Sequence, residues 1–192
     1  IRLFKLDARF DKATALFKAK KFLKAAREFE RLANEDKRSS NIDRAYFNAA
    51  IAYNKVKYYD SASRIFEKLV TDPRFKNSSF AADSLLNLAE NYKLFFYFDK
   101  AITAYLAHFN RYPDSSQRPY VLMQAAILQE NNGDYRRAAA TYERYATAFP
   151  ARKETPSAFF EVGVLFEKLK DRGEQRRIWQ EVIKRYSSQI GR

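Results

Sequence analysis

The sequence lacks cysteine, and it has only one histidine and four glycines among its 192 residues. Without cysteine the chain forms no disulfide bond and offers no thiolate to act as a nucleophile or to bind zinc. The glycines do not have the spacing of a phosphate-binding loop, and acidic pairs such as Glu28 and Glu30 face different directions on a helix. We therefore expect no catalytic residues, no cofactor and no metal site, and we predict that the protein is not an enzyme.

Long hydrophobic runs are also missing, because no stretch approaches the ~18 consecutive apolar residues of a membrane-spanning helix. The chain begins at Ile1 rather than Met and has no leader pattern of basic, then apolar, then small residues. We expect that a targeting signal or lipid anchor, if the protein has one, precedes residue 1. Peripheral attachment to a membrane would then depend on that anchor.

Hydrophobic residues make up 46% of the chain and aromatic residues 16%, which is ample for a folded core. The formal net charge is +13. The positive charge is concentrated towards the two ends of the chain and is nearly absent from the middle. This charge suits an anionic partner such as a nucleic acid, an acidic lipid surface or an acidic protein.

The most informative pattern is an internal repeat with a period of 37 to 39 residues. Each copy has a very small residue, then twelve positions later a second site that is alanine in four copies, then four positions later a large aromatic residue. These three columns are Ala13, Ala50, Ala89, Ala126 and Gly163; Ala25, Ala62, Ala101, Ala138 and Gln175; and Phe29, Phe66, Tyr105, Tyr142 and Trp179. A small residue lets two helices approach closely, and an aromatic one turn further on fills the space to the next pair. The period therefore predicts stacked helical hairpins.

Each copy is predicted to form a helix, a short turn, a second helix and a loop. The expected repeats cover residues 7–36, 42–72, 79–112, 118–149 and 156–187, in a single array over 1–192. We expect an aromatic residue in the first four turns: Phe22, Tyr59, Phe98 and Tyr135. Pro73, Pro113 and Pro150 are expected to follow the ends of second helices, because proline cannot extend a helix. Pro119 and Pro156 are expected at the first helical position, with Thr155 as the capping residue before Pro156.

These columns resemble the tetratricopeptide repeat over essentially the whole chain. The resemblance implies an all-α fold, a right-handed superhelical solenoid of about five helix-turn-helix hairpins. It also implies a non-catalytic scaffold that binds a partner protein segment. Loops ending in Tyr112-Pro113-Asp114-Ser115 and Phe149-Pro150 resemble the bacterial cell-envelope branch of the family, which includes BamD-type outer-membrane lipoproteins and Tol-Pal-associated periplasmic repeat proteins. This narrower resemblance favours the periplasm, or the periplasmic face of the outer membrane, over the cytoplasm as the alternative.

In the family, the first helix of each hairpin lines the concave surface, so the resemblance implies a groove built from positions around the small residues. The implied groove residues are Phe10, Phe47, Asn48, Ile51, Leu86, Asn87, Met123, Gln124, Ile127, Phe160 and Val164. Apolar walls with a row of amides suit a peptide or an amphipathic helix, because amides both donate and accept hydrogen bonds. The alternative is that the apolar members only pack the first helices against their neighbours.

Some family members bind an acidic C-terminal carboxylate with a clamp of lysine and asparagine residues. Asn48 and Asn87 stand at positions that resemble those of the clamp, but Phe10 and Asp83 stand where the clamp would need lysine. We therefore do not expect this chain to bind such a tail.

The basic ends support an alternative function, in which a helical-repeat module binds an anionic polymer or surface through counterion release. Nucleic acid, cell-wall polymer and lipid head groups are candidates. The basic residues of the first and last repeats are Lys18, Lys20, Lys21, Lys24, Arg27 and Arg31, and Arg172, Arg176, Arg177, Lys184 and Arg185. Most aromatic residues that could stack on bases are expected in helix packing, so nucleic acid ranks below protein as a partner.

The single histidine, His108, also has a predicted structural role. It follows the large aromatic by three positions, where the other repeats have Leu32, Leu69, Tyr145 and Val182. We therefore expect His108 to lie in the packing between helices rather than to act as a base or a metal ligand.

Overall fold

The computed structural model describes residues 2–35 and 41–186. These residues form ten α-helices and one 3₁₀ helix, and they include no β-strand. The all-α fold predicted from the sequence is therefore confirmed. The predicted ends of the first and last repeats, residues 36 and 187, lie outside the described residues.

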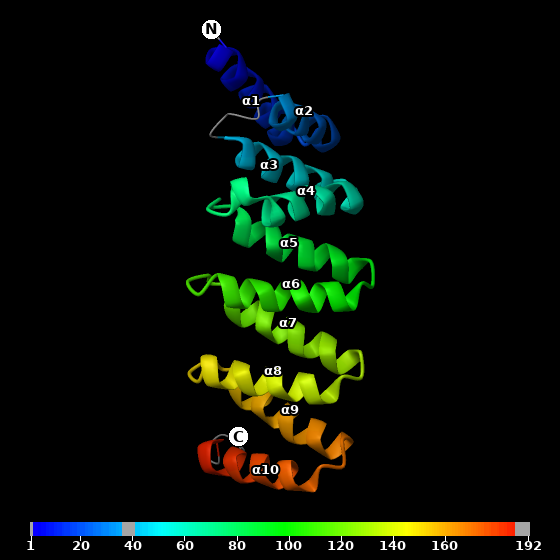
Figure 1. Cartoon of the computed structure of the whole chain (residues 1–192), viewed down its shortest axis with the longest axis vertical. Coiled ribbons are helices and arrows are strands. Elements are labelled where there is room, and N and C mark those ends of the chain that lie inside the picture. The colour runs from blue at the N-terminus through cyan, green and yellow to red at the C-terminus, as the bar shows by residue number, and fades with distance from the viewer. Residues whose placement is uncertain (1, 36–40, 187–192) are drawn as a thin grey trace. The chain divides into compact units, whose positions relative to one another are not determined.

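The chain divides into two compact units, Ile1–Tyr97 and Phe98–Arg192, called unit 1 and unit 2 below. Unit 1 contains α1 (Arg2–Lys18), α2 (Phe22–Glu35), α3 (Ile42–Lys55), α4 (Tyr59–Thr71), the 3₁₀ helix η1 (Pro73–Phe75) and α5 (Ala81–Leu94). Unit 2 contains α6 (Phe98–Arg111), α7 (Arg118–Asn131), α8 (Tyr135–Ala148), α9 (Thr155–Lys168) and α10 (Arg172–Tyr186). Within each unit, consecutive helices run in opposite directions and pack against each other (Figure 1). None of the helices in the described ranges combines the length and the apolar character needed to cross a membrane.

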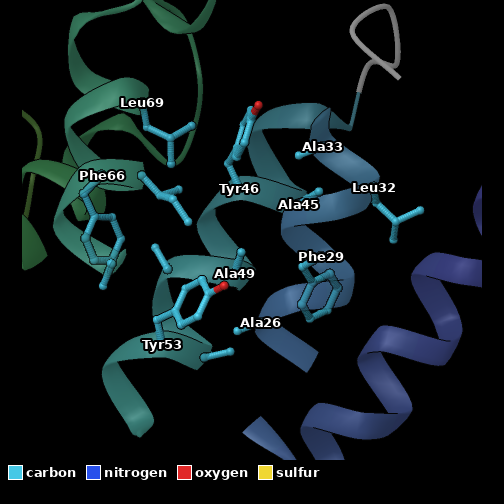
Figure 2. Packing of buried hydrophobic residues seen from close by; sticks show 14 of the residues in the cluster. Ala26, Phe29, Leu32, Ala33, Ala45, Tyr46, Ala49, Tyr53, Phe66 and Leu69 are labelled. Atoms are coloured by element: carbon cyan, nitrogen blue, oxygen red, sulfur yellow. The ribbon is translucent and has the colours of Figure 1, made fainter. Parts of the chain in front are cut away.

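The core of unit 1 shows how small and large residues alternate between helices (Figure 2). Ala26 and Phe29 of α2 face Ala45 and Ala49 of α3, and all four are buried. Phe66 of α4 approaches α3 from its other side and is fully buried. Because alanine lets the backbones approach closely, the aromatic rings fill the space that remains between the helices.

The large aromatic residues of the repeat occupy the expected interior positions in the first four copies. Phe29, Phe66, Tyr105 and Tyr142 are all buried. In the fifth copy the larger ring of Trp179 lies directly over Gly163, where an added Cβ atom would be 2.7 Å from Trp179 Cζ2. In this copy the small residue of the repeat is therefore glycine instead of alanine, and the large aromatic residue is tryptophan instead of phenylalanine or tyrosine.

The turns within the hairpins differ from the sequence expectation. Phe22, Tyr59, Phe98 and Tyr135 are the first residues of α2, α4, α6 and α8, not turn residues. Two positions earlier in every copy stands a residue with a positive φ angle, and these residues are Lys20, Lys57, Phe96, Gly133 and Lys170. Because a left-handed residue after a helix reverses the chain, the next helix can begin two positions later.

Helix ends in the loops between hairpins follow the prolines. The helices α4, α6 and α8 end two residues before Pro73, Pro113 and Pro150, as predicted. The helices α7 and α9 begin one residue earlier than expected, so Pro119 and Pro156 follow the first helical residue. Thr155 is consequently inside α9 rather than its cap, and its hydroxyl donates a hydrogen bond to the carbonyl oxygen of Phe149. Proline is tolerated there because the first N–H groups of a helix have no partner within it.

Candidate protein-binding face

The first helices of the hairpins bury one face and leave a second face partly open to solvent. On each first helix, the predicted groove residues lie outside the fully buried side. We call this partly open side the first-helix face, and we use the term for each unit by itself. In unit 1 it consists of Phe10, Phe47, Asn48, Ile51, Leu86 and Asn87, and in unit 2 of Met123, Gln124, Ile127, Phe160 and Val164. All are half-buried except Phe160, whose exposed fraction is 47%.

Aromatic contacts hold the phenylalanine side chains on the first-helix face of unit 1 in place. The ring of Phe10 meets Phe29 edge to face at 5.2 Å, and the guanidinium of Arg44 lies 4.9 Å from the Phe10 ring centroid. Phe47 stacks on Phe80 at 4.9 Å and meets the buried Phe66 at 6.1 Å. These side chains therefore rest on the core on one side and present the rest of their rings to solvent. A ring held in this way loses little conformational entropy when a ligand covers it.

The two amides of unit 1 are in different hydrogen-bonding states. Asn48 makes no side-chain hydrogen bond with any described residue. Asn87 donates from Nδ2 to the backbone oxygen of Asp83, one turn earlier in α5, at 2.8 Å. Its side-chain oxygen therefore remains available as an acceptor, whereas Asn48 offers both a donor and an acceptor.

The first-helix face of unit 2 ends at a tryptophan. Phe160 meets Trp179 at a ring separation of 4.7 Å, so the most exposed aromatic of the face is supported by the ring that covers Gly163. On α7, Met123 and Ile127 are one turn apart and lie on the same side of the helix. Tyr120, three residues before Met123, is 41% exposed and meets the buried Tyr105 at 6.4 Å.

Three residues next to this face were not predicted from the sequence. Arg44 and Tyr120 stand three residues before Phe47 and Met123, so the helical spacing that identified those two columns could have found them as well. Phe80 lies in the loop before α5, and helical spacing carries no information about a loop residue.

Polar contacts also join neighbouring hairpins within each unit. Glu30 of α2 accepts hydrogen bonds from the Tyr53 hydroxyl of α3 and from Arg64 of α4, both at 2.8 Å. Burial and the nearby Glu30 carboxylate raise the pKa of Tyr53 to about 12. In unit 2, Arg177 of α10 contacts Glu143 of α8 at 2.6 Å. These contacts join second helices to their neighbours. The first helices of unit 2 are also joined, because Lys168 of α9 forms an ion pair with Glu130 of α7 at 2.8 Å, one turn beyond Ile127 and Val164.

The charges at the basic ends of the chain are only partly compensated. In the last repeat Arg177 and Arg185 form ion pairs, and both contact Glu181. In the first repeat Arg31 contacts Glu28 at 2.6 Å. The exposed lysines of the first hairpin form no ion pair with a described residue: Lys18, Lys20, Lys21 and Lys24. In the last repeat the exposed Arg172, Arg176 and Lys184 likewise form no ion pair with a described residue, so both ends of the chain carry uncompensated positive charge.

His108 lies where the sequence placed it, within the packing. It is fully buried, and its ring lies 5.4 Å from that of Tyr112. Among residues 2–35 and 41–186, no three histidine, aspartate or glutamate side chains come together as metal ligands would.

Comparison with known proteins agrees with this arrangement. Residues 120–151, which cover α7 and α8, match the family model described as tetratricopeptide repeat. The hairpin of α7 and α8 is therefore a tetratricopeptide repeat. The fold of this family supports a general role as a protein-interaction scaffold. No curated protein sequence matches the chain.

Several solved structures have a similar fold at low sequence identity. MamA is 14% identical over 96% of this chain and 93% of its own, with a TM-score of 0.62. BtubC (BKLC) from P. vanneervenii is 17% identical over 94% of this chain and 79% of its own, with a TM-score of 0.59. YrrB, described as a TPR protein with an unusual peptide-binding site, is 15% identical over 95% and 87% of the two chains, with a TM-score of 0.58. At these identities the likeness concerns the fold alone.

Proposed function

We propose that this protein is a non-catalytic scaffold of tetratricopeptide repeats that binds apolar segments of a partner protein on the first-helix faces of its two units. The observation that carries the proposal is the partial exposure of aromatic and aliphatic side chains at the same position in successive first helices. Phe47 and Phe160 are the best anchors, because each rests on a buried or half-buried ring and presents its other side to solvent. A few such anchors usually provide most of the binding energy of an interface.

The amides favour a segment with accessible polar backbone groups. Asn48 has both hydrogen-bonding groups free, and Asn87 has a free oxygen. An extended peptide, or the end of a helix, offers the matching N–H and C=O groups. YrrB shows that the fold is compatible with peptide binding, since its own description names a peptide-binding site.

The test uses peptides selected from a random display library on the full chain, followed by calorimetric titration. We expect selected peptides to be rich in apolar residues. The double variant Phe47→Ala and Phe160→Ala should weaken their binding by about 30-fold or more, which corresponds to about 2 kcal/mol. Circular dichroism must first establish that the variant is folded.

The matched control is charge reversal at two basic residues outside the face, Lys21→Glu with Arg177→Glu. This control should change mainly the association rate and its dependence on salt. If charge reversal abolishes binding while the phenylalanine variant still binds, the first-helix face is not the binding site. The alternative function, binding of an anionic polymer, would then replace this one.

We further propose that the scaffold works in an assembly of the bacterial cell envelope. Support comes only from the Tyr112-Pro113-Asp114-Ser115 and Phe149-Pro150 loops, which resemble that branch of the family. The test is to determine the complete N-terminus of the encoded protein. A signal peptide followed by a lipid-modified cysteine would support the proposal, and a start codon directly before the first repeat would overturn it.

A further inference from the structure

A second exposed surface lies at the edge of unit 1 where the hairpin turns meet, on the right of Figure 1. We call it the turn edge of unit 1. It carries four large exposed hydrophobic residues, with exposed fractions of 49% for Tyr58, 51% for Leu94, 77% for Phe96 and 54% for Tyr97. It also carries the exposed lysines Lys18, Lys20, Lys21, Lys55 and Lys57.

Ring contacts make the hydrophobic part of this edge continuous. Tyr59 at the start of α4 meets Phe95 at 6.1 Å, and Phe95 meets Tyr97 at 5.9 Å. Tyr58 stacks on the buried Tyr53, with the two rings nearly parallel. The exposed aromatics therefore stand on a supported aromatic layer that joins the turn of one hairpin to the end of α5.

Phe96 is the most exposed of the four hydrophobic residues of this edge. It has φ of 60°, a left-handed conformation that is unfavourable for a side chain with a Cβ atom. Gly133 occupies the same position of the repeat with φ of 79°, which indicates that the turn accepts glycine. With 77% of its surface exposed, Phe96 also gains little from burial. The left-handed conformation is common to the hairpin turns, so what distinguishes Phe96 is the large apolar side chain that it exposes at this position, where three other turns have lysine.

The charges identify the chemistry of the partner. No ion pair with a described residue neutralises Lys18, Lys20, Lys21, Lys55 or Lys57. Exposed acids follow two of the turns: Asp60 after Tyr58, and Asp99 after Tyr97. Protein interfaces are enriched in aromatic residues but depleted in lysine. Surfaces that lie on membranes combine lysine with aromatic and leucine side chains, because the lysines contact anionic head groups while the rings enter the interface.

We propose that the turn edge of unit 1 binds an anionic lipid membrane surface. Phe96, Leu94 and Tyr97 enter the head-group region, and the lysines of the three turns contact lipid phosphates. This site is separate from the first-helix face, so the proposal does not depend on the proposed function.

The experiment is co-sedimentation of the full chain with vesicles of three parts phosphatidylcholine and one part phosphatidylglycerol, and with vesicles of phosphatidylcholine alone. We expect binding to the anionic vesicles only. Phe96→Gly should lower the partition coefficient by about tenfold, as expected for withdrawing one phenylalanine from an apolar phase. The same variant should melt at the same temperature as the wild type or higher, because glycine relieves the left-handed backbone. Binding and stability should therefore change independently, which no purely structural role of Phe96 would produce.

Matched variants at the same turn position test the electrostatic part. Lys57→Gly removes a positive charge from the proposed surface and should weaken binding by about fivefold, since each lysine near an anionic membrane contributes about that much. Lys170→Gly changes the equivalent turn position of unit 2 and should leave binding unchanged within twofold. Wild-type protein that stays in the supernatant, or binding unaffected by Phe96→Gly, would overturn the proposal. So would equal losses in Lys57→Gly and Lys170→Gly, which would indicate attraction by net charge alone.

Discussion

The two faces of helix α3 carry similar residues in different surroundings. On one face Tyr46, Ala49 and Tyr53 are buried against α2 and α4 (Figure 2). On the other face Phe47 and Ile51 are half-buried at the border of the core, and the Phe47 ring contacts Phe80 and Phe66. An aromatic residue in this fold can therefore either close the space between hairpins or remain available for binding. Whether the aromatic residue is buried or available depends on its position relative to the small residue of the repeat.

The comparison is sharpest for two contacting phenylalanines, Phe66 and Phe47. Phe66→Ala deletes a fully buried ring between helices and should lower the free energy of unfolding by about 3–5 kcal/mol. Phe47→Ala removes a ring that is already partly hydrated, so the loss should be under about 2 kcal/mol. Urea denaturation of both variants measures the difference. Equal losses would mean that the first-helix face is simply part of the core.

The second prediction concerns the fifth hairpin, where glycine and tryptophan replace alanine and a smaller ring. Gly163→Ala places a Cβ atom 2.7 Å from Trp179 Cζ2, and the overpacking should cost about 1–3 kcal/mol. The cost should shrink in a Trp179→Phe background, because the two changes share one contact. A double-mutant cycle with no coupling between them would contradict the packing account of the small column.

A third prediction concerns Tyr53, which borders the buried face and also reaches Glu30. Because the pKa of Tyr53 is raised from 10 to about 12 in the folded state, the stability linked to its hydroxyl is complete below pH 10. That stability is lost as the pH rises from 10 through 12. Tyr53→Phe should cost about 1 kcal/mol at neutral pH through loss of the hydrogen bond to Glu30.

The difference between wild type and Tyr53→Phe should therefore narrow between pH 10 and pH 12. Tyrosines other than Tyr53 titrate in both proteins, so their contributions cancel in the comparison. Denaturation midpoints measured at intervals across that range would settle the point, and a constant difference would argue against a titrating Tyr53.

Much of the fold could be predicted from the sequence because the repeat supplies five copies of each constraint. The small and aromatic columns located the helices, and Pro73, Pro113 and Pro150 located the ends of three of them. The turns were predicted less well. A left-handed residue is evident in the sequence only at Gly133, whereas Lys20, Lys57, Phe96 and Lys170 adopt the same conformation without a glycine to indicate it.

The candidate face was predictable only where helical spacing applies. The column of Phe47 and Met123 follows from the repeat, but contacts made by a loop residue such as Phe80 depend on how the chain returns between hairpins. The turn edge of unit 1 was missed for a related reason. The sequence assigned Phe98 and its equivalents to the turns, and so drew attention away from Leu94, Phe96 and Tyr97.

The central claim is that the half-buried side of the first helices, rather than a basic surface, binds the partner segment. Met123 is the single methionine of the chain and lies on this side of α7. Protein labelled with ¹³C in the methionine methyl group therefore gives one NMR signal from the proposed site. Titration with a peptide selected on the wild-type chain should shift or broaden that signal in proportion to occupancy, and the Phe47→Ala and Phe160→Ala double variant should require far more peptide. A peptide that binds with unchanged affinity while the Met123 signal stays in place would contradict the claim.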